Sequence, residues 1–216
     1  MDNLKIFTVP VGAMRVNCYL LRDEATGFGA IVDPGGESPE LGSSRILAKC
    51  AAEGIDVKYI LLTHAHFDHM LSLERVRDAT GAPLCLHKYD AEALTNPNLS
   101  YMAQFAGIHT PCRPAERLLD DGDVIQLGET PLTVMHTPGH TVGSVCYMTG
   151  DIILTGDTLF SGSIGRCDFY GGDDLAMLQS LGKLKGLADK GNFRLYPGHG
   201  GATTLEREMK NNIYLK

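Results

Sequence analysis

The sequence of 216 residues has no apolar run that approaches the roughly 20 residues of a membrane-spanning helix. Its N-terminus, Met1-Asp2-Asn3-Leu4-Lys5, lacks the basic flank and apolar core of a signal peptide. Basic residues are few: 19 Lys and Arg stand against 26 Asp and Glu, for a net charge of -7. Because nucleic-acid binding requires a basic surface, this charge disfavours a nucleic-acid partner. We therefore expect a cytoplasmic protein with a small-molecule partner and no membrane partner; the sequence leaves the oligomeric state open.

The sequence also has no CxxC pair, although it contains six cysteines. They are scattered, and some lie inside apolar runs, as Cys85 does in Pro83-Leu84-Cys85-Leu86. Isolated cysteines in apolar surroundings are typical of buried, reduced thiols in a reducing compartment. A disulfide framework or a thiolate metal site is the less favoured alternative.

No linker, low-complexity tract or strong short-period repeat divides the chain, and its length suits one well-packed domain over residues 1–216. Glycine is abundant instead, with 25 residues against the roughly 15 expected at average usage. Because glycine permits tight turns and close backbone approach, the excess predicts many strand-to-loop transitions around a compact site.

Apolar runs and periodicity predict strands and helices in both halves of the chain. Strands are expected over residues 4–9, 17–21, 29–33, 60–63, 84–87, 124–127, 132–135, 144–148, 152–155 and 193–196. Helices are expected over 38–54, 71–80, 175–187 and 204–212, whereas 95–117 has little periodicity and is expected to be a long loop or lid. Strands in the middle with helices outside predict a layered α/β domain. The similar order of elements in the two halves indicates a pseudo-twofold sandwich.

The segment Thr63-His64-Ala65-His66-Phe67-Asp68-His69 places four potential metal ligands within six residues, between a predicted buried strand and a predicted helix. Residues two apart in an extended segment point the same way, so His64 and His66 can bind one ion together. Asp68 and His69 then stand at the start of the helix, turned toward a neighbouring position. A lone histidine or an aspartate helix cap would be ordinary, but the whole cluster at a strand end predicts a metal site.

Three further candidate ligands follow predicted strands and lie beside glycine. They are His140 in HTPGHT, Asp157 in LTGDT and His199 in YPGHG. Glycine lets the backbone turn sharply and hold the neighbouring side chain inward. Each has an ordinary interpretation as a loop residue, but together they supply the ligands that the first cluster lacks.

The motifs HxHxDH, TPGHT, TGDTLF and PGHG, in this order, are similar to those of the metallo-β-lactamase superfamily, over roughly residues 6–212. The chain resembles its glyoxalase II-like (hydroxyacylglutathione hydrolase-like) branch, and residues 162–169 and 198–204 resemble a short, single-domain subgroup. The resemblance implies a four-layer αββα sandwich with the metal site at one edge, between the two sheets. It implies two ligand sets: His64, His66 and His140 for one ion, and Asp68, His69 and His199 for the other, with Asp157 bridging. His136 is expected to support the site or to pack, and His87 and His109 match no motif.

Such a site implies a hydrolase with two divalent metal ions, for which we expect Zn2+ first; nitrogen and oxygen ligands also suit Fe and Mn. A hydroxide that bridges the ions would attack a thioester or ester carbonyl at neutral pH. Asp68 is then a candidate catalytic residue that orients this hydroxide. We expect an acyl thioester such as S-lactoylglutathione as the substrate. Aspartate at position 157 fits this chemistry, because true β-lactamases of the family typically have cysteine there and are exported.

Two alternatives use the same fold: a persulfide dioxygenase with a single iron on His64, His140 and Asp157, and a lactonase on the same metals. Arg166 roughly matches a basic residue that contacts glutathione in the family, and Tyr170 is a weaker candidate for the same substrate-binding surface. Arg166 would otherwise pair with Asp168 and brace its loop, and the sequence leaves both roles open. The segment 95–117 is a further candidate for substrate specificity.

Overall fold

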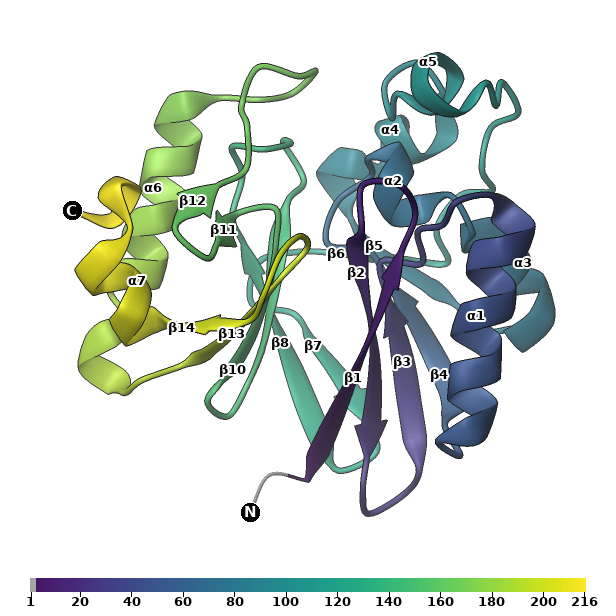
Figure 1. Cartoon of the computed structure of the whole chain (residues 1–216), viewed down its shortest axis with the longest axis horizontal. Coiled ribbons are helices and arrows are strands. Elements are labelled where there is room, and N and C mark those ends of the chain that lie inside the picture. The colour runs from purple at the N-terminus through teal and green to yellow at the C-terminus, as the bar shows by residue number, and fades with distance from the viewer. Residues whose placement is uncertain (1–2) are drawn as a thin grey trace.

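The computed structural model describes residues 3–216. Met1 and Asp2 lie outside the described residues. Both belong to the domain predicted over residues 1–216 and to the N-terminal segment in which no signal peptide is predicted. Two six-stranded β-sheets face each other, and helices cover the outer face of each sheet (Figure 1). This arrangement is the four-layer αββα sandwich that the resemblance implies.

The first sheet comes from residues 4–119. Its strands lie in chain order: β1 (Leu4–Val11), β2 (Val16–Asp23), β3 (Phe28–Val32), β4 (Asp56–Leu61), β5 (Leu84–His87) and β6 (Arg117–Leu119). β1 to β3 are antiparallel, whereas β3 to β6 are parallel. The connections between the parallel strands contain α1 (Pro39–Ala52) and α3 (Leu73–Thr80). Ile46 of α1 and Val76 of α3 pack with Leu20 and Ile60 in the core on the outer face.

The second sheet comes from the second half. Its order is β14 (Thr203–Thr204), β13 (Arg194–Pro197), β10 (Ile152–Gly156), β9 (Val145–Thr149), β8 (Thr130–His136) and β7 (Val124–Leu127). β10 and β13 are parallel, and the other pairs are antiparallel. α6 (Asp174–Lys185) and α7 (Leu205–Asn211) cover its outer face, where Leu181 and Leu205 pack with Ile153 and Leu195.

Apolar side chains from both sheets fill the space between them. Leu21 of β2 points into this inner core, whereas its neighbour Leu20 points toward the helices, as the two-residue period of a strand requires. Tyr147 of β9 is fully buried between the sheets, and its hydroxyl donates a hydrogen bond of 2.8 Å to the carbonyl of Leu62. Burial on both faces of each sheet explains the continuous apolar runs of the inner strands.

The predicted long helices and most of the predicted strands agree with the structure to within a few residues, but the expected loop over 95–117 is wrong in part. This stretch begins on the last residue of α4 (Ala91–Thr95), contains α5 (Met102–Ala106) and ends on the first residue of β6. The hairpin of β11 (Leu159–Phe160) and β12 (Ser163–Ile164) and the short α2 (Phe67–Met70) were also not predicted. Elements of two to five residues are shorter than the windows that reveal periodicity.

Two further sequence expectations concern membranes and cysteines. No helix within residues 3–216 combines the length and the apolar character needed to cross a bilayer. All six cysteines are free thiols; Cys167 is half-buried and the others are buried.

Candidate metal centre

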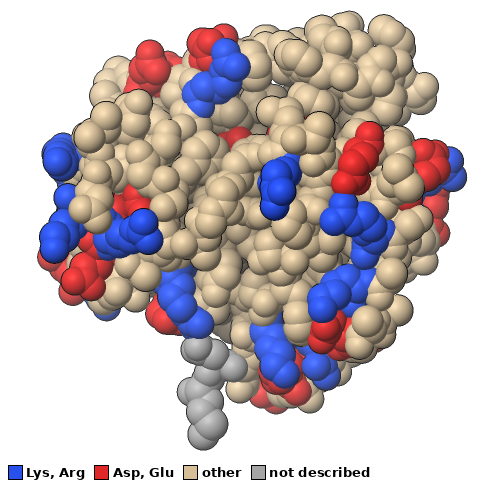
Figure 2. All heavy atoms as spheres, viewed as in Figure 1, with Lys and Arg blue, Asp and Glu red and all other residues tan. Residues whose placement is uncertain are grey.

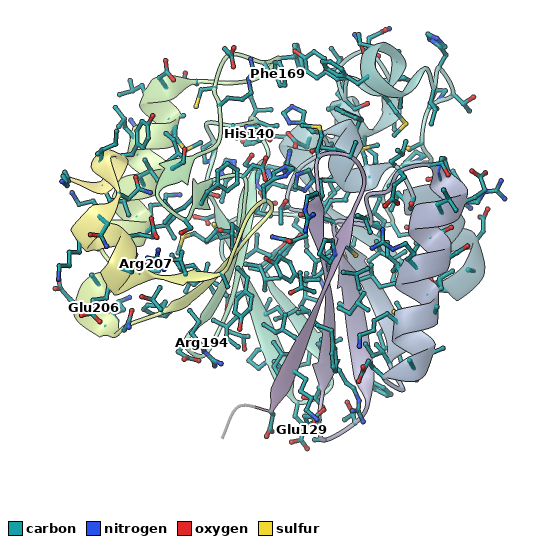
Figure 3. All side chains as sticks on the ribbon, in the orientation of Figure 1. Glu129, His140, Phe169, Arg194, Glu206 and Arg207 are labelled. Atoms are coloured by element: carbon teal, nitrogen blue, oxygen red, sulfur yellow. The ribbon has the colours of Figure 1, made fainter. Side chains whose placement is uncertain are left out.

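All candidate ligands lie at one edge of the sandwich, where strands of both sheets end. They occupy the loops and the short helix after β4 (His64, His66, Asp68, His69), the loop after β8 (His140), the end of β10 (Asp157) and the loop after β13 (His199). The carboxyl ends of parallel strands share one edge of a sheet, which is the usual place for a site in layered α/β folds. In Figure 3, His140 lies between the two sheets near their upper edge.

The structure brings all seven predicted ligands together. They form three overlapping groups, each with ligand atoms within 4.8 Å of one another: His64 with His66 and His140; His64 with His69 and Asp157; Asp68 with His69 and His199. The first and third groups match the two ligand sets that the resemblance implies. Two residues of the middle group, His64 and His69, also belong to one of the other groups.

Asp157 lies between the two ligand sets. Its carboxylate oxygens are 3.6 Å from Nε2 of His140, on one side, and 3.4 and 3.5 Å from Nε2 of His69 and His199, on the other. Gly198, the residue before His199, makes this approach possible: a Cβ there would lie 2.2 Å from Oδ1 of Asp157 and 2.7 Å from the ring of His69. The glycine of the PGHG motif is therefore required by packing at the site.

Hydrogen bonds on the outer side of the rings orient their inner nitrogens. Nδ1 of His140 donates to the carbonyl of Arg166 at 2.7 Å, and Nδ1 of His199 donates to the carbonyl of Met14 at 3.1 Å. Because a carbonyl only accepts, Nδ1 carries a proton in both rings; when either ring is neutral, as a metal ligand must be, the lone pair of Nε2 faces the cluster. Metal-binding histidines are typically held in this way.

Asp33 organises the same side of the centre, although in the sequence it is evident only as part of a turn. It is buried and accepts hydrogen bonds from the Thr63 amide at 2.8 Å, the Thr63 hydroxyl at 2.7 Å and Nδ1 of His69 at 3.0 Å. Since the Thr63 hydroxyl donates to Asp33, it accepts from Nδ1 of His64 at 3.1 Å. Asp33 has a φ of 53°, a left-handed conformation that aspartate tolerates better than most residues.

Asp90 is the second organising carboxylate that was not predicted. It is buried, and it accepts hydrogen bonds from the amides of Ala65 and Gly143 and from the hydroxyl of Thr141, at 2.8–2.9 Å. Burial raises the pKa of Asp90 despite these hydrogen bonds. Asp90 thus joins the HxHxDH loop of the first half to the HTPGHT loop of the second.

Unsatisfied polar atoms at the centre test whether metal ions fit. Among the described residues, Nε2 of His64 and Oδ1 of Asp157 are buried without a hydrogen-bond partner, as is Nε2 of His66. A buried polar atom with no partner costs about 1–3 kcal/mol. His64 and Asp157 belong to the same ligand group, where a cation would satisfy both atoms. The nitrogen and oxygen donors are therefore compatible with a dinuclear metal site.

The electrostatics of the cluster favour a cation. Burial lowers the pKa of His64 well below its ordinary value and lowers that of His66 to about 3, so both rings are neutral ligands. Burial acts in the same direction on His199, but the carboxylates of Asp157 and Asp68 outweigh it and raise its pKa to about 9. For His69, burial is likewise outweighed, and its pKa is raised well above the ordinary value. Divalent cations bound at the cluster would neutralise the negative charge of the carboxylates, which the protons on His69 and His199 otherwise do.

The predicted substrate-binding residues lie above the centre. Arg166 lines the cavity there, forms two hydrogen bonds of 2.6 Å to the carboxylate of Asp168 and lies 4.0 Å from the ring centre of Phe169. Tyr170 is exposed, and its amide donates a hydrogen bond of 2.8 Å to the hydroxyl of Tyr101. Its side chain lines a smaller hollow beside the main cavity. Neither contact tests a role in substrate binding, which stays a prediction.

The remaining histidines do not join the cluster. His87 and His136 stack on each other with ring centres 4.0 Å apart, and Nε2 of His136 donates to the carbonyl of Val142 at 2.8 Å. His109 is exposed. His136, the first residue of the HTPGHT motif, thus packs against His87 and is not part of any ligand group.

A cavity of about 450 Å3 opens onto the candidate ligands. Its floor contains His66, Asp68, His140, Asp157 and His199. Its walls are largely apolar and are formed by Met14, Phe67, Tyr101, Phe105, Phe160, Gly165, Arg166 and Phe169. The aromatic residues of the walls were missed in the sequence, because those at 101 and 105 lie in the segment without periodicity.

Comparison with known families and curated proteins agrees with these observations. The model of the metallo-beta-lactamase superfamily matches residues 11–199. A probable metallo-hydrolase of Bacillus subtilis, YqgX, is 33% identical over 96% of this chain and 95% of its own. The hydroxyacylglutathione hydrolase GloC of Haemophilus influenzae is 29% identical over 98% of each chain.

Two solved structures are similar over nearly the whole chain. The BLEG-1 B3 metallo-beta-lactamase superposes with a TM-score of 0.88 and 33% identity, covering 98% of this chain and all of the other. TTHA1623 in a di-iron-bound form superposes with a TM-score of 0.82 and 34% identity, covering 97% of this chain and all of the other. The chain thus shares its fold with a metallo-beta-lactamase and with a protein whose structure contains a di-iron centre.

Proposed function

Because this chain belongs to the metallo-β-lactamase superfamily, we propose that it is a hydrolase with two metal ions that cleaves an acyl thioester such as S-lactoylglutathione. The observation that carries the proposal is that seven side chains converge in three ligand groups. In these groups, Nε2 of His64 and Oδ1 of Asp157 are buried without a hydrogen-bond partner, and a bound cation would satisfy both atoms. The similarity to a hydroxyacylglutathione hydrolase supports a thioester as the substrate.

The two ligand sets would hold the ions, one by His64, His66 and His140 and the other by Asp68, His69 and His199, with Asp157 between them. Two divalent ions would supply a Lewis acid for the carbonyl oxygen and a water whose pKa is lowered toward neutrality. Seven ligands exceed the four that a closed structural site uses, which favours a catalytic role. Zinc is the first expectation, and the di-iron form of a related structure makes iron an explicit alternative.

Asp68 is the carboxylate best placed to orient the attacking water. It lines the cavity, and Nε2 of His199 lies 3.3 Å from its Oδ2. Burial opposes the ionisation of Asp68, but the charge of His69 and the hydrogen bond from His199 outweigh it and lower its pKa. Asp68 therefore stays ionised at neutral pH and is able to orient a water molecule by accepting its hydrogen bond.

Metal content and thioester turnover test the proposal together. The purified protein is analysed for metals and assayed with S-lactoylglutathione before and after chelation and re-addition of Zn2+. About two equivalents of metal, with hydrolysis that chelation abolishes and zinc restores, are expected. Asp68→Asn keeps the shape of the side chain and is expected to lower kcat by at least about 100-fold. Hydrolysis unaffected by chelation would contradict the proposal.

The same preparations distinguish the other functions. One equivalent of iron, with no hydrolysis and with oxygen uptake on a persulfide, would replace the proposal with the dioxygenase. Hydrolysis of a lactone without hydrolysis of thioesters would favour the lactonase. A β-lactam is included as a substrate because one of the similar solved structures is that of a metallo-beta-lactamase.

A further inference from the structure

The cavity above the candidate ligands is walled by aromatic rings from both halves of the chain. Tyr101 and Phe169 lie with ring centres 4.6 Å apart, and Phe67 and Phe105 stack at 5.2 Å. Tyr101 and Phe169 also approach the His66 ring edge-on, at 5.8 and 5.7 Å. Figure 3 shows Phe169 above His140, in the loop that covers this edge of the sandwich. The space next to the reacting centre is therefore bounded mainly by apolar surface.

Basic side chains that could pair with the carboxylates of a substrate are scarce around the cavity. Among the described residues that line it, Arg166 is the only lysine or arginine. Both oxygens of the Asp168 carboxylate already accept hydrogen bonds from its guanidinium. The ion pair with Asp168 offsets the charge of Arg166 and so weakens its attraction for a carboxylate of the substrate.

A second cavity of about 320 Å3 adjoins the first and shares Met14, Phe67, Asp68 and Phe105 with it. Its other walls include Val11, Val16, Leu71 and Ile108. The charged residues that line it, Glu37 and Asp68, are both acidic. Arg15 follows Met14 in the chain but lines neither cavity. The cleft thus offers two adjoining apolar compartments that share Asp68. Among the described residues of their walls, the one Lys or Arg is Arg166, which pairs with Asp168.

The segment that closes one side of both compartments is itself uncharged. No Lys, Arg, Asp or Glu occurs from residue 93 to residue 112. Phe105 of α5 is 60% exposed at the rim. In Figure 2, the lobe that carries α5 in Figure 1 shows neither basic nor acidic residues. An exposed aromatic ring on an uncharged rim indicates contact with an apolar ligand.

From these observations we propose that the substrate is a thioester with an apolar, preferably aromatic, acyl group, and that its thiol portion is recognised without its carboxylates. The inference rests on the proposed thioester hydrolysis and specifies its substrate class. Water adds its oxygen to the carbonyl carbon, the carbon–sulfur bond breaks with its electron pair going to sulfur, and the thiol and the carboxylic acid leave. The aromatic rings at 101, 105 and 169 are the specificity-determining residues.

Four thioesters separate the contribution of the acyl group from that of the thiol. The zinc-loaded protein is assayed with phenylacetyl and lactoyl thioesters of glutathione and of N-acetylcysteamine, which lacks the carboxylates of glutathione. We expect the phenylacetyl group to raise kcat/KM at least about tenfold on either thiol, since an apolar pocket discriminates by this order. For a given acyl group, replacing N-acetylcysteamine with glutathione as the thiol is expected to change kcat/KM by less than about threefold. A lactoyl thioester turned over as well as its phenylacetyl counterpart, or a tenfold advantage for glutathione, overturns the inference.

Variants assign the effect to the rings. Phe105→Ala and Phe169→Ala are expected to reduce the preference for phenylacetyl at least about fivefold, whereas Phe28→Ala leaves it unchanged. Phe28 is a suitable control because it is partly exposed on β3, with the Lys58 amine 4.5 Å from its ring centre and no part in either cavity. A preference that survives both cavity variants overturns the assignment.

A binding measurement keeps the inference separate from the proposed chemistry. Calorimetric titration compares S-benzyl-N-acetylcysteamine, S-benzylglutathione and S-methylglutathione, which are thioethers and cannot be hydrolysed. We expect both benzyl compounds to bind at least about tenfold more tightly than the methyl compound. If no thioester is hydrolysed but this order holds, the proposed function fails and the apolar site stands. Equal binding of benzyl and methyl thioethers overturns the inference whatever the turnover.

Discussion

At the scale of single residues, side chains outside the candidate ligand set hold the candidate ligands in position through hydrogen bonds. Asp33 and Asp90 are each buried, each accept three hydrogen bonds, and each hold a loop that bears ligands. The HxHxDH motif therefore points to candidate ligands but not to the carboxylates that orient them. A sequence pattern shows which residues lie close along the chain, whereas Asp33 acts on a ring 36 positions away.

Asp33→Asn tests this orienting role. Asparagine tolerates the left-handed backbone, but its amide cannot accept from the Thr63 amide, the Thr63 hydroxyl and His69 together. We expect metal affinity to fall about 10- to 100-fold, measured by competition with a chromogenic chelator. Asp56→Asn, at an exposed carboxylate that pairs with Lys58, serves as the matched control. Equal metal affinity in the two variants would refute the role.

His87 provides a prediction about acid stability. Burial, followed by the neighbouring His136, lowers the pKa of His87 to about 4, whereas an unfolded histidine titrates near 6.5. Between these values the unfolded chain binds more protons than the folded one, so stability falls as the pH drops from about 6.5 to 4. His87→Gln is expected to remove at most about 3 kcal/mol of this loss. The free energy of unfolding in urea is measured at pH 7 and pH 4.5 for the unsubstituted protein, for His87→Gln and for the control His109→Gln, whose histidine is exposed. The same pH dependence in all three proteins would contradict the prediction.

At the scale of elements, the long helices were predictable because each is fixed by several local signals. In α1, Ser38 caps the N-terminus by accepting from the Leu41 amide at 3.2 Å, and Pro39 follows it. In α6, Asp173 accepts from the Ala176 amide at 2.9 Å. The helix α5 has no such cap, since its N-terminal neighbour Tyr101 is left-handed with a φ of 62°. Its conformation is set by tertiary contacts, which the local sequence does not reveal.

The contact between α6 and the HTPGHT loop yields a paired prediction. A Cβ on Gly139, whose φ is 141°, would lie 2.5 Å from backbone atoms of Met177 in α6. Gly139→Ala is therefore expected to lower the free energy of unfolding by at least about 2 kcal/mol and to displace His140.

The matched control is Gly182→Ala in the same helix, where a Cβ meets nothing within 4 Å. This variant is expected to stabilise the protein by about 0.5–1 kcal/mol. Urea unfolding of both variants provides the measurement. Destabilisation of similar size in both would show that the close approach at Gly139 is unimportant.

At the scale of the whole molecule, the site exists only where the two halves meet. The ligands come from both sheets, and Asp157, His140 and His199 face the HxHxDH segment across the edge of the sandwich. The family motifs were sufficient to predict the fold and the seven candidate ligands that the structure brings together. The aromatic cavity was not predictable, because rings such as Tyr101 and Phe169 are 68 residues apart and meet only after the sheets have packed.

Metal ions are consequently expected to stabilise the fold as a whole. A ligand that binds only the folded state adds about 4 kcal/mol at 1,000 times its Kd. Chelation is expected to lower the thermal midpoint by several degrees, and re-addition of Zn2+ to restore it. Calorimetry with and without chelator measures the shift; an unchanged midpoint would show that bound metal does not contribute to stability.

The hydrogen bond from His199 to the carbonyl of Met14 joins the last ligand in the sequence to the first hairpin. Asn17, also in that hairpin, donates through its side chain to the carbonyls of Pro197 and Gly200. During synthesis, a nascent chain that exposes only the first sheet therefore holds neither complete ligand set, since both require residues of the second. Completion of the first candidate ligand set must follow translation of His140, and completion of the second must follow translation of the PGHG loop. A ribosome-bound first half therefore presents no finished site to a cation.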